Sequence, residues 1–267
     1  MGDRTKIEWA QASYNPWMGC AKVSEGCRNC YAQRDMKRFG RDFGTPTRSK
    51  TTFEDPLKWK EPRRIFVCSW SDFFLETVPP DWREDAWAVM RQAPQHTYLL
   101  LTKRPQNIAG MLPKTWTARP YPNVWLGVSA ENQRRADERI PLLLQVPAAV
   151  HFVSAEPLLG PIDFLGPWYD WLTGWATQAE PDQRGDPVPV QVQTDKLNWV
   201  ITGGESDLQN LRPMDLAWVR SIRDQCQEAG VAFFYKQRGG TRKINGAWGG
   251  RELDGRTWDE FPQGTSR

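Results

Sequence analysis

The chain has 267 residues and a formal net charge of +3. That length can bury a large core, and the mild positive charge is compatible with a nucleic-acid partner. No apolar run approaches the ~20 residues that a membrane-spanning helix needs, and residues 1–11 lack the apolar core of a secretory signal. We therefore expect a cytoplasmic protein without membrane association. The two histidines, His96 and His151, nearly exclude a histidine-rich zinc site, and a Ser-His-Asp triad would have to use one of them.

Short apolar runs alternate with amphipathic stretches along the chain. Helices are predicted at residues 81–93, at 131–145 with a kink or break at Pro141, and at 213–230. Such alternation favours parallel βαβ units, and about seven strands suit a partial or complete (β/α) TIM-like barrel of the α/β class. Besides one strand before residue 20, the predicted strands are 64–70, 97–102, 123–129, 150–154, 198–204 and 231–236.

The barrel is expected to occupy residues 1–240. Residues 165–197 break the alternation and are rich in proline, glycine and glutamine, so we interpret them as an insertion or lid. Residues 241–267 are expected to form a C-terminal extension, either a small hairpin or a loosely packed tail. The 15 tryptophans could stack on nucleobases or fill the barrel core and its rim.

Each predicted strand ends in polar or charged side chains. One such ending is easily a helix cap, but six in succession predict a functional cavity, because α/β folds bind ligands beyond the carboxyl ends of their strands. In chain order the candidates are Ser69, Asp72, Lys103, Ser129, Glu131, Ser154, Glu156, Glu205 and Lys236.

Three cysteines, Cys20, Cys27 and Cys30, share one loop with the spacing Cys-x6-Cys-x2-Cys, and residues 20–30 are the predicted metal-binding loop. Clustered thiols in a reducing compartment indicate metal or redox chemistry. Structural zinc takes four ligands, whereas three thiolates suit a [4Fe-4S] cluster with one open iron. Cys68, in a predicted strand, and Cys226, in a predicted helix, are expected to be buried small hydrophobes.

The loop sequence NPWMGC…GCRNCYA resembles the cluster loop of radical S-adenosylmethionine (SAM) enzymes, especially the spore-photoproduct-lyase-like branch. The wider chain resembles a phage- and prophage-associated three-cysteine-motif family of unknown function. The stretches that carry this resemblance include TKIEWAQASYNPWMGC, LLLTKRPQ, VWLGVSAEN, WVITGGES and FFYKQRGG, and together they span about residues 5–240.

The resemblance implies a partial barrel with a cluster loop after the first strand and Cys20, Cys27 and Cys30 as cluster ligands. In radical SAM enzymes the open iron binds the amino and carboxylate groups of SAM, which is cleaved to a radical that abstracts hydrogen from the substrate. Two features differ here. The first spacing is six residues instead of three, and the expected Gly-Gly-Glu after the second strand occurs instead at residues 203–205.

We assign expected roles to the strand-end residues on this basis. Ser69, Asp72, Ser129, Glu131 and Ser154 are expected to contact the cofactor, with Asp72 replacing the missing glutamate at the SAM amino group. Four charged residues are expected to act on the substrate: Lys103, Glu156, Glu205 and Lys236.

Three functions remain open from the sequence. The first is a radical SAM-type enzyme acting on a nucleic acid or nucleotide, in base modification or lesion repair. The second is a non-enzymatic iron–sulfur protein that binds nucleic acid or acts as a sensor. The third is a zinc-stabilised barrel with hydrolytic chemistry. DNA, RNA or a protein encoded nearby are the expected partners. Basic residues after the loop could contact phosphates or form a solvated helix face: Arg34, Lys37, Arg38, Arg41, Arg48 and Lys50.

Overall fold

The computed structural model describes residues 5–116, 120–182, 184, 186–206 and 210–262. Its main sheet has seven parallel strands, in the order β1-β4-β5-β6-β7-β12-β13. These strands are β1 (Ala12–Tyr14), β4 (Arg64–Val67), β5 (Thr97–Thr102), β6 (Val124–Ser129), β7 (His151–Ala155), β12 (Trp199–Gly203) and β13 (Ala232–Gln237).

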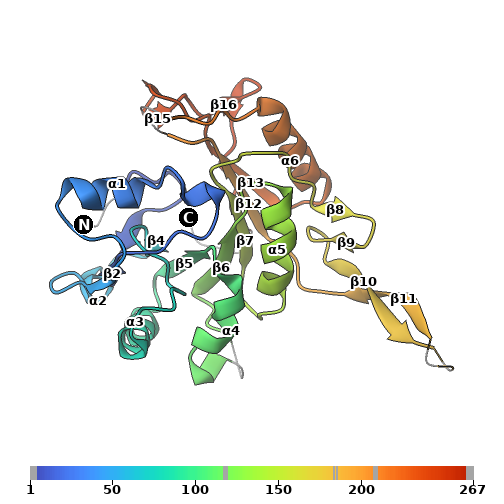
Figure 1. Cartoon of the computed structure of the whole chain (residues 1–267), viewed down its shortest axis with the longest axis horizontal. Helices are drawn as coiled ribbons and strands as arrows, with labels where there is room; N and C mark the ends of the chain where they lie inside the picture. Colours follow the sequence, from blue (N-terminus) through green and yellow to red (C-terminus); the bar gives the residue numbers. More distant parts are fainter. Residues whose placement is uncertain (1–4, 117–119, 183, 185, 207–209, 263–267) are drawn as a thin grey trace.

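The sheet curls into a half-barrel, as Figure 1 shows, and confirms the α/β class and the predicted strands. Among the described residues β1 and β13 are the two edges of this sheet, so the partial form of the barrel is the one observed. The helices are α1 (Tyr31–Arg38), α2 (Asp55–Lys58), α3 (Pro80–Gln92), α4 (Ile108–Met111), α5 (Gln133–Leu144) and α6 (Leu216–Glu228), with 3-10 turns η1 (Glu25–Cys27), η2 (Pro105–Asn107) and η3 (Lys114–Trp116).

Capping side chains define where the two long C-terminal helices begin. Asn132 accepts a hydrogen bond from the backbone of Arg135 at the start of α5, and Asp215 accepts one from Ala217 at the start of α6. Helix α6 thus begins later than the proline at 213 predicted. Helix α5 continues through Pro141, where a kink or break was expected, and buries Ile140 and Leu143 on either side.

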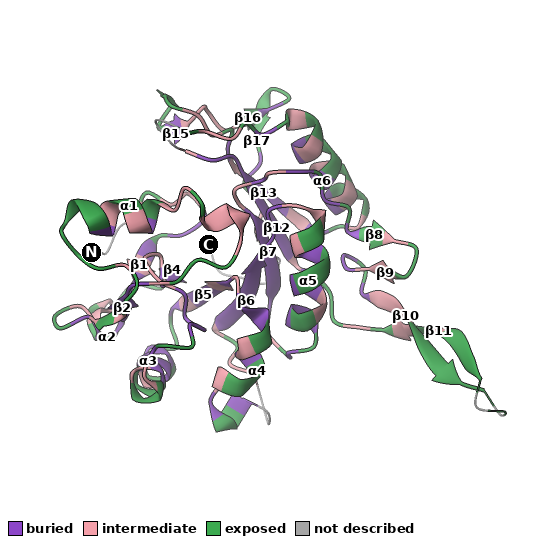
Figure 2. Ribbon diagram, viewed as in Figure 1, coloured by how far each residue is buried: buried purple, intermediate pink, exposed green. Residues whose placement is uncertain are grey.

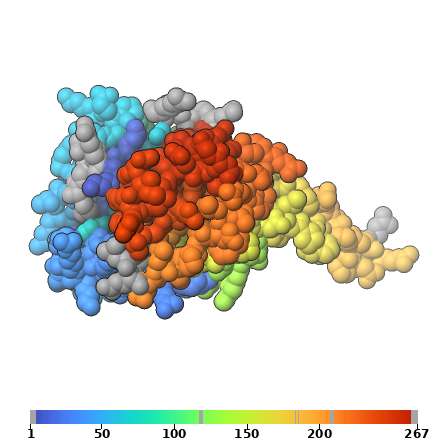
Figure 3. Space-filling model, turned by 90° about the horizontal axis from the view of Figure 1, so that it is seen from above, coloured from blue at the N-terminus to red at the C-terminus, as the bar shows by residue number. Residues whose placement is uncertain are grey.

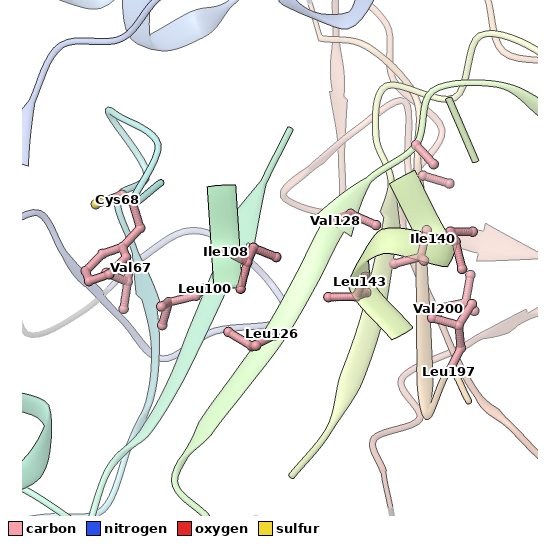
Figure 4. Close-up of a cluster of buried hydrophobic side chains, with 14 of the residues drawn as sticks. Val67, Cys68, Leu100, Ile108, Leu126, Val128, Ile140, Leu143, Leu197 and Val200 are labelled. Carbon is pink, nitrogen blue, oxygen red and sulfur yellow. The ribbon is translucent and has the colours of Figure 1, made fainter. Parts of the chain in front are cut away.

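Alternation along the strands divides the core into two clusters. One lies between the sheet and the helices, where Val128 of β6 and Ile140 of α5 belong to the same cluster (Figure 4). The other lies on the opposite face of the sheet, is rich in aromatics, and contains Trp9, Phe66 and Trp199. Figure 2 shows the strands as the most buried part of the molecule. Eight of the 15 tryptophans are buried, so many of them are core residues.

Residues 165–193 form a separate antiparallel sheet of four strands. The strands are β8 (Leu165–Gly166), β9 (Tyr169–Asp170), β10 (Trp175–Pro181) and β11 (Pro187–Gln193). The β10–β11 hairpin projects from the body as an exposed arm (Figures 1 and 3). The described residues of this arm do not line the main cavity, so it is not a lid in this conformation.

Removing the arm is expected to have little effect on stability. If residues 178–190 are replaced by a short glycine-containing turn, the melting temperature should stay within about 3 °C, because almost all of the removed side chains are exposed. Calorimetry of the two proteins checks this. A much larger drop would mean that the arm packs against the body.

The C-terminal segment packs on the half-barrel. It contains two hairpins, formed by β14 (Lys243–Ile244) with β15 (Ala247–Trp248) and by β16 (Glu252–Leu253) with β17 (Arg256–Thr257). Trp258 joins the helix-side cluster, and Phe261 packs against the aromatic cluster. Of the two expected forms of this segment, the hairpin is observed, in two copies, and the loosely packed tail is not found as far as residue 262. Residues 263–267 lie outside the described residues. Within the described chain, no helix is long and apolar enough to cross a membrane.

The short strand β2 (Trp17–Met18) precedes the cysteine loop and α1 in the chain, and β3 (Thr47–Arg48) follows them. The two strands pair with each other. This pairing closes the segment between β1 and β4 into a compact unit.

Candidate functional site

A cavity of about 660 Å³ opens at the carboxyl edge of the half-barrel. Its lining includes all three loop cysteines. It also includes most of the strand-end residues that the sequence singled out: Ser69, Asp72, Lys103, Ser129, Ser154, Glu156 and Lys236. The aromatic cluster extends to this space, because Trp9 and Phe66 also line it. Parallel strands bring their carboxyl ends to one edge, which is why residues far apart in sequence meet here.

The three cysteines are free thiols of intermediate exposure on one wall of the cavity. In the part of the chain that the structure describes, no group of three or more His, Cys, Asp or Glu residues converges to hold a single metal ion. The thiolates of a [4Fe-4S] cluster bind different irons, so its ligands need to border a common space instead of one point. All three loop cysteines border the same cavity, and a preformed site for one zinc ion is not among these residues.

Arg104 connects the first cysteine to the strand ends. Its guanidinium donates to Ala21 O at 2.7 Å, lies 3.8 Å from Cys20 Sγ and forms an ion pair of 3.2 Å with Asp72. Asp72 also accepts hydrogen bonds from Thr102 Oγ1 at 2.7 Å and from the backbone of Lys103 at 3.2 Å. Both oxygens of Asp72 are therefore occupied by protein donors, and Asp72 orients Arg104 beside the cysteine loop.

Neighbouring groups act in opposite directions on the pKa of the Cys20 thiol. Burial is the main cause that raises the pKa of the Cys20 thiol to about 11, and Asp72 adds to it, while Arg104 acts in the opposite direction. A thiolate at this position therefore needs positive charge in addition to Arg104, as a bound metal supplies.

A second ion pair lies elsewhere on the cavity wall. Lys236 Nζ and Glu156 Oε1 are 2.8 Å apart, and Ser154 Oγ donates to Glu156 Oε2 at 2.9 Å. Burial alone would lower the pKa of Lys236, but the carboxylates of Glu156 and, to a smaller extent, Glu8 more than offset this and raise it above its ordinary value. A Cβ atom at Gly203 would lie 2.6 Å from Glu156 Oε1, so the glycine leaves room for this carboxylate.

Three further strand-end residues that the sequence singled out also line the cavity. Ser129 is the register partner of Ser154 on neighbouring strands, and both are buried. Ser69 shares hydrogen bonds with Asn15, at 3.0 and 3.2 Å. Lys103 lines the cavity, and its ammonium group has no hydrogen bond or ion pair within the described residues.

Glu8 is a cavity residue that the sequence analysis missed. It lines the cavity beside Trp9, and its Oε2 is buried without a hydrogen-bond partner among the described residues. It precedes β1, so a search of strand ends could not find it. An acidic residue between Ile7 and Trp9, just before the first strand, was the available signal.

Glu131 supports the cysteine loop instead of lining the cavity. Its fully buried carboxylate pairs with Arg139 at 2.8 Å and accepts a hydrogen bond from Ser24 Oγ at 2.6 Å. Arg139 also donates to the carbonyl of Ser129 at 2.7 Å. Glu131 is therefore not placed for the contact with a cofactor in the cavity that the sequence analysis expected.

Glu205 has a similar supporting role. It pairs with Arg212 and accepts a hydrogen bond of 2.9 Å from Asn29, next to the third cysteine. Arg212 also donates to the carbonyl of Glu25 at 2.8 Å. The carboxylate expected to act on a substrate is thus paired within the protein, and it does not line the cavity.

A third set of contacts joins the loop to helix α5. The Glu25 carboxylate pairs with Arg135 at 2.7 Å and accepts a hydrogen bond from Asn132 at 2.7 Å. Together, Glu131, Glu205, Arg135 and Arg212 hold the segment between Ser24 and Asn29, and we call these four residues the loop anchor.

Gly26 is required by this packing. A Cβ atom there would lie 2.6 Å from Glu131 Cδ, and the Glu131 side chain has no free space because Ser24 and Arg139 hold it. We expect Gly26→Ala to lower the free energy of unfolding by about 1–3 kcal/mol through overpacking. Urea unfolding would measure the change, with Gly44→Ala as control, where the nearest atom would be 3.6 Å away. Equal stability of the two variants would contradict the expectation.

Both histidines are structural. His96 Nε2 lies 3.0 Å from the carbonyl of Pro56, and His151 Nε2 lies 2.7 Å from that of Val146. Burial lowers the pKa of each ring. Neither lines the cavity, so a triad cannot be assembled from them there.

The two remaining cysteines are buried, as predicted. Cys226 lies in the helix-side core, and Cys68 belongs to the same cluster while also bordering the cavity. Cys68 directly follows β4 instead of lying within it, with φ of 60°.

Fold and cavity together define a partial (β/α) barrel protein with its candidate site at the carboxyl edge. A family model described as "Protein of unknown function (DUF5131)" matches residues 4–262. The chain therefore belongs to this family. Neither curated proteins nor solved structures gave a match.

Proposed function

We propose that the protein is an iron–sulfur protein of radical SAM type that acts on a nucleic acid or a nucleotide, in base modification or lesion repair. The observation that carries the proposal is that Cys20, Cys27 and Cys30 line one cavity with the strand-end residues. Barrel enzymes bind and transform ligands at this edge. The loop's resemblance to radical SAM enzymes, and the chain's resemblance to phage-associated three-cysteine proteins, support the chemistry and the substrate class.

The three thiolates would hold three irons of a [4Fe-4S] cluster. When bound, such a cluster supplies an open iron and an electron for the reductive cleavage of SAM. Arg104, 3.8 Å from Cys20 Sγ, places a positive charge beside the thiolates. The loop anchor fixes the segment between the first and third cysteines before any metal enters.

The Lys236–Glu156 pair would bind polar groups of the cofactor or substrate. An ammonium and a carboxylate 2.8 Å apart can receive a carboxylate and an amine, or ribose hydroxyls, from one ligand. Lys103 adds a cation for a phosphate or carboxylate, and Trp9 and Phe66 exclude water from the inner side.

An iron–sulfur protein that does not cleave SAM is the second candidate. It is favoured by the engagement of Asp72 and Glu205 with Arg104 and Arg212, which leaves neither carboxylate ready to bind the SAM amino group. For both candidates we place the protein in the cytoplasm, where a reducing environment keeps thiols free.

Anaerobic reconstitution with iron and sulfide tests the proposal, followed by metal analysis and EPR of the reduced protein with and without SAM. About four irons and a spectrum that SAM perturbs support the radical enzyme. The same iron content without a response to SAM supports the second candidate. One tightly bound zinc ion in place of iron would overturn both.

A further inference from the structure

We propose that the cavity rim binds a single strand of nucleic acid and that its exposed aromatic side chains stack on unpaired bases. The inference rests on the proposed function, because it takes the cavity as the place where the substrate reacts. It narrows the substrate from nucleic acids and nucleotides in general to a nucleotide within a single strand.

Aromatic rings gather at the mouth of the cavity. Trp70 lines the cavity, and Phe39, just after α1, stacks beside it with ring centroids 6.2 Å apart and planes at 18°. Phe39 is 62% exposed, and Tyr31, another lining residue, is 43% exposed. The Tyr31 hydroxyl donates to Ser69 O at 2.6 Å, which fixes its ring. Exposed flat rings of this kind accept any base by stacking.

Positive charge accompanies these rings. Helix α1 carries the exposed Arg34, Lys37 and Arg38, and Arg34 also lines the cavity. Within the described chain, Lys37 and Arg38 have no ion pair or side-chain hydrogen bond with another residue, so both can contact phosphates. From the C-terminal hairpin, Lys243 and Trp248 reach the same cavity.

A second hollow of about 660 Å³ lies on the other side of the segment that follows α1. It is lined by Lys50, Trp82 and Glu54, together with Arg48 and Lys58, which pair with Asp85 and Asp55 at 2.8 and 2.9 Å. One short segment borders both spaces, since Phe43 lines the cavity and Pro46 lines the second hollow. The backbone of Cys20 donates to Phe43 O at 2.7 Å, which fixes this segment against the cysteine loop. Two hollows bordered by the same short segment suit a strand of several nucleotides better than a free nucleotide.

The location of the charged pair favours an unpaired base. Lys236 and Glu156 are largely buried, with side-chain exposures of 22% and 14%. A base inside a duplex cannot reach such groups unless it is extruded, at the expense of stacking and pairing energy. A single strand avoids that cost.

Fluorescence anisotropy with labelled oligo-dT, oligo-U and a duplex of equal length tests the inference, on metal-free and on reconstituted protein. We expect at least ~10-fold tighter binding of a single strand than of the duplex. Phe39→Ala and Trp70→Ala should each weaken binding about 10-fold, the effect of losing one stacked base. Trp168→Ala is the matched control, because Trp168 is also 62% exposed but lies between β8 and β9.

A double Lys37→Glu, Arg38→Glu variant should reduce the slope of log affinity against log salt by about 1.4, because each lost phosphate contact on a single strand lowers it by about 0.7. Lys196→Glu serves as the charge control. Comparison of oligo-dT with oligo-U distinguishes DNA from RNA as the preferred strand.

Duplex binding as tight as single-strand binding, or aromatic variants equal to Trp168→Ala, would overturn the inference. Iron analysis of the same samples separates its failure from that of the proposed function. Strand binding that depends on Phe39 and Trp70 in a protein that holds no iron leaves this inference standing alone. Four irons with a response to SAM but no strand binding leaves only the proposed function.

Discussion

Replacing Cys20, Cys27 or Cys30 by alanine is expected to reduce the iron content of the reconstituted protein from about four atoms per chain to near zero. Each thiolate would hold a different iron, so the loss of one leaves two ligands for the whole cluster. The described residues offer no converging group that could replace it. Iron and sulfide analysis after anaerobic reconstitution and desalting measures the effect.

Cys226→Ala is the matched control for these variants. Cys226 lies on α6 and belongs to the helix-side core cluster. It does not line the cavity, so its removal should leave the iron content unchanged. Circular dichroism of each variant would establish that the fold is retained. If a variant with all three loop cysteines replaced by alanine bound as much iron as the wild type, the loop would not be the cluster site.

Glu131→Ala is expected to lower the free energy of unfolding by about 3–5 kcal/mol, because it leaves the guanidinium of Arg139 buried without its partner. Arg139 is 4% exposed and its ion pair with Glu131 measures 2.8 Å. The variant also removes the acceptor of Ser24 Oγ, so the cysteine loop loses its contact with one residue of the loop anchor. Urea unfolding of the metal-free proteins measures the difference.

The control for this variant lies on α5, the helix that carries Arg139. Arg134 and Glu138 form an exposed pair of 2.9 Å on α5, and Arg134→Ala should change stability by about 0.5 kcal/mol or less. Glu131→Gln keeps hydrogen-bonding capacity without the charge and should fall between the two. A loss below about 1 kcal/mol for Glu131→Ala would show that Arg139 finds another partner or reaches water.

The strands and the cavity edge could be predicted because both depend on local pattern. Apolar runs such as residues 97–102 are short enough for buried strands, and their ends converge in any parallel sheet. This is why Ser129, Ser154 and Lys236 were found together without knowledge of the curvature of the sheet.

The use of each carboxylate could not be predicted in the same way. Ser24 and Glu131 are 107 residues apart, and Asn29 and Glu205 are 176 apart, so these pairings depend on tertiary structure. A glutamate after a strand can face the cavity or turn behind the neighbouring loop, and the sequence looks alike in both cases. Glu156 faces the cavity, where it pairs with Lys236, while Glu131 and Glu205 turn behind the neighbouring loop.

The long spacing between the first two cysteines affects how the protein would respond to oxygen. Ser24, Glu25 and Gly26, which fill the end of that spacing, are the residues that the rest of the chain grips. A loop fastened in this way keeps its shape when it is empty. Loss of the proposed cluster to oxygen would therefore leave the loop folded, and reloading would not require a newly made chain.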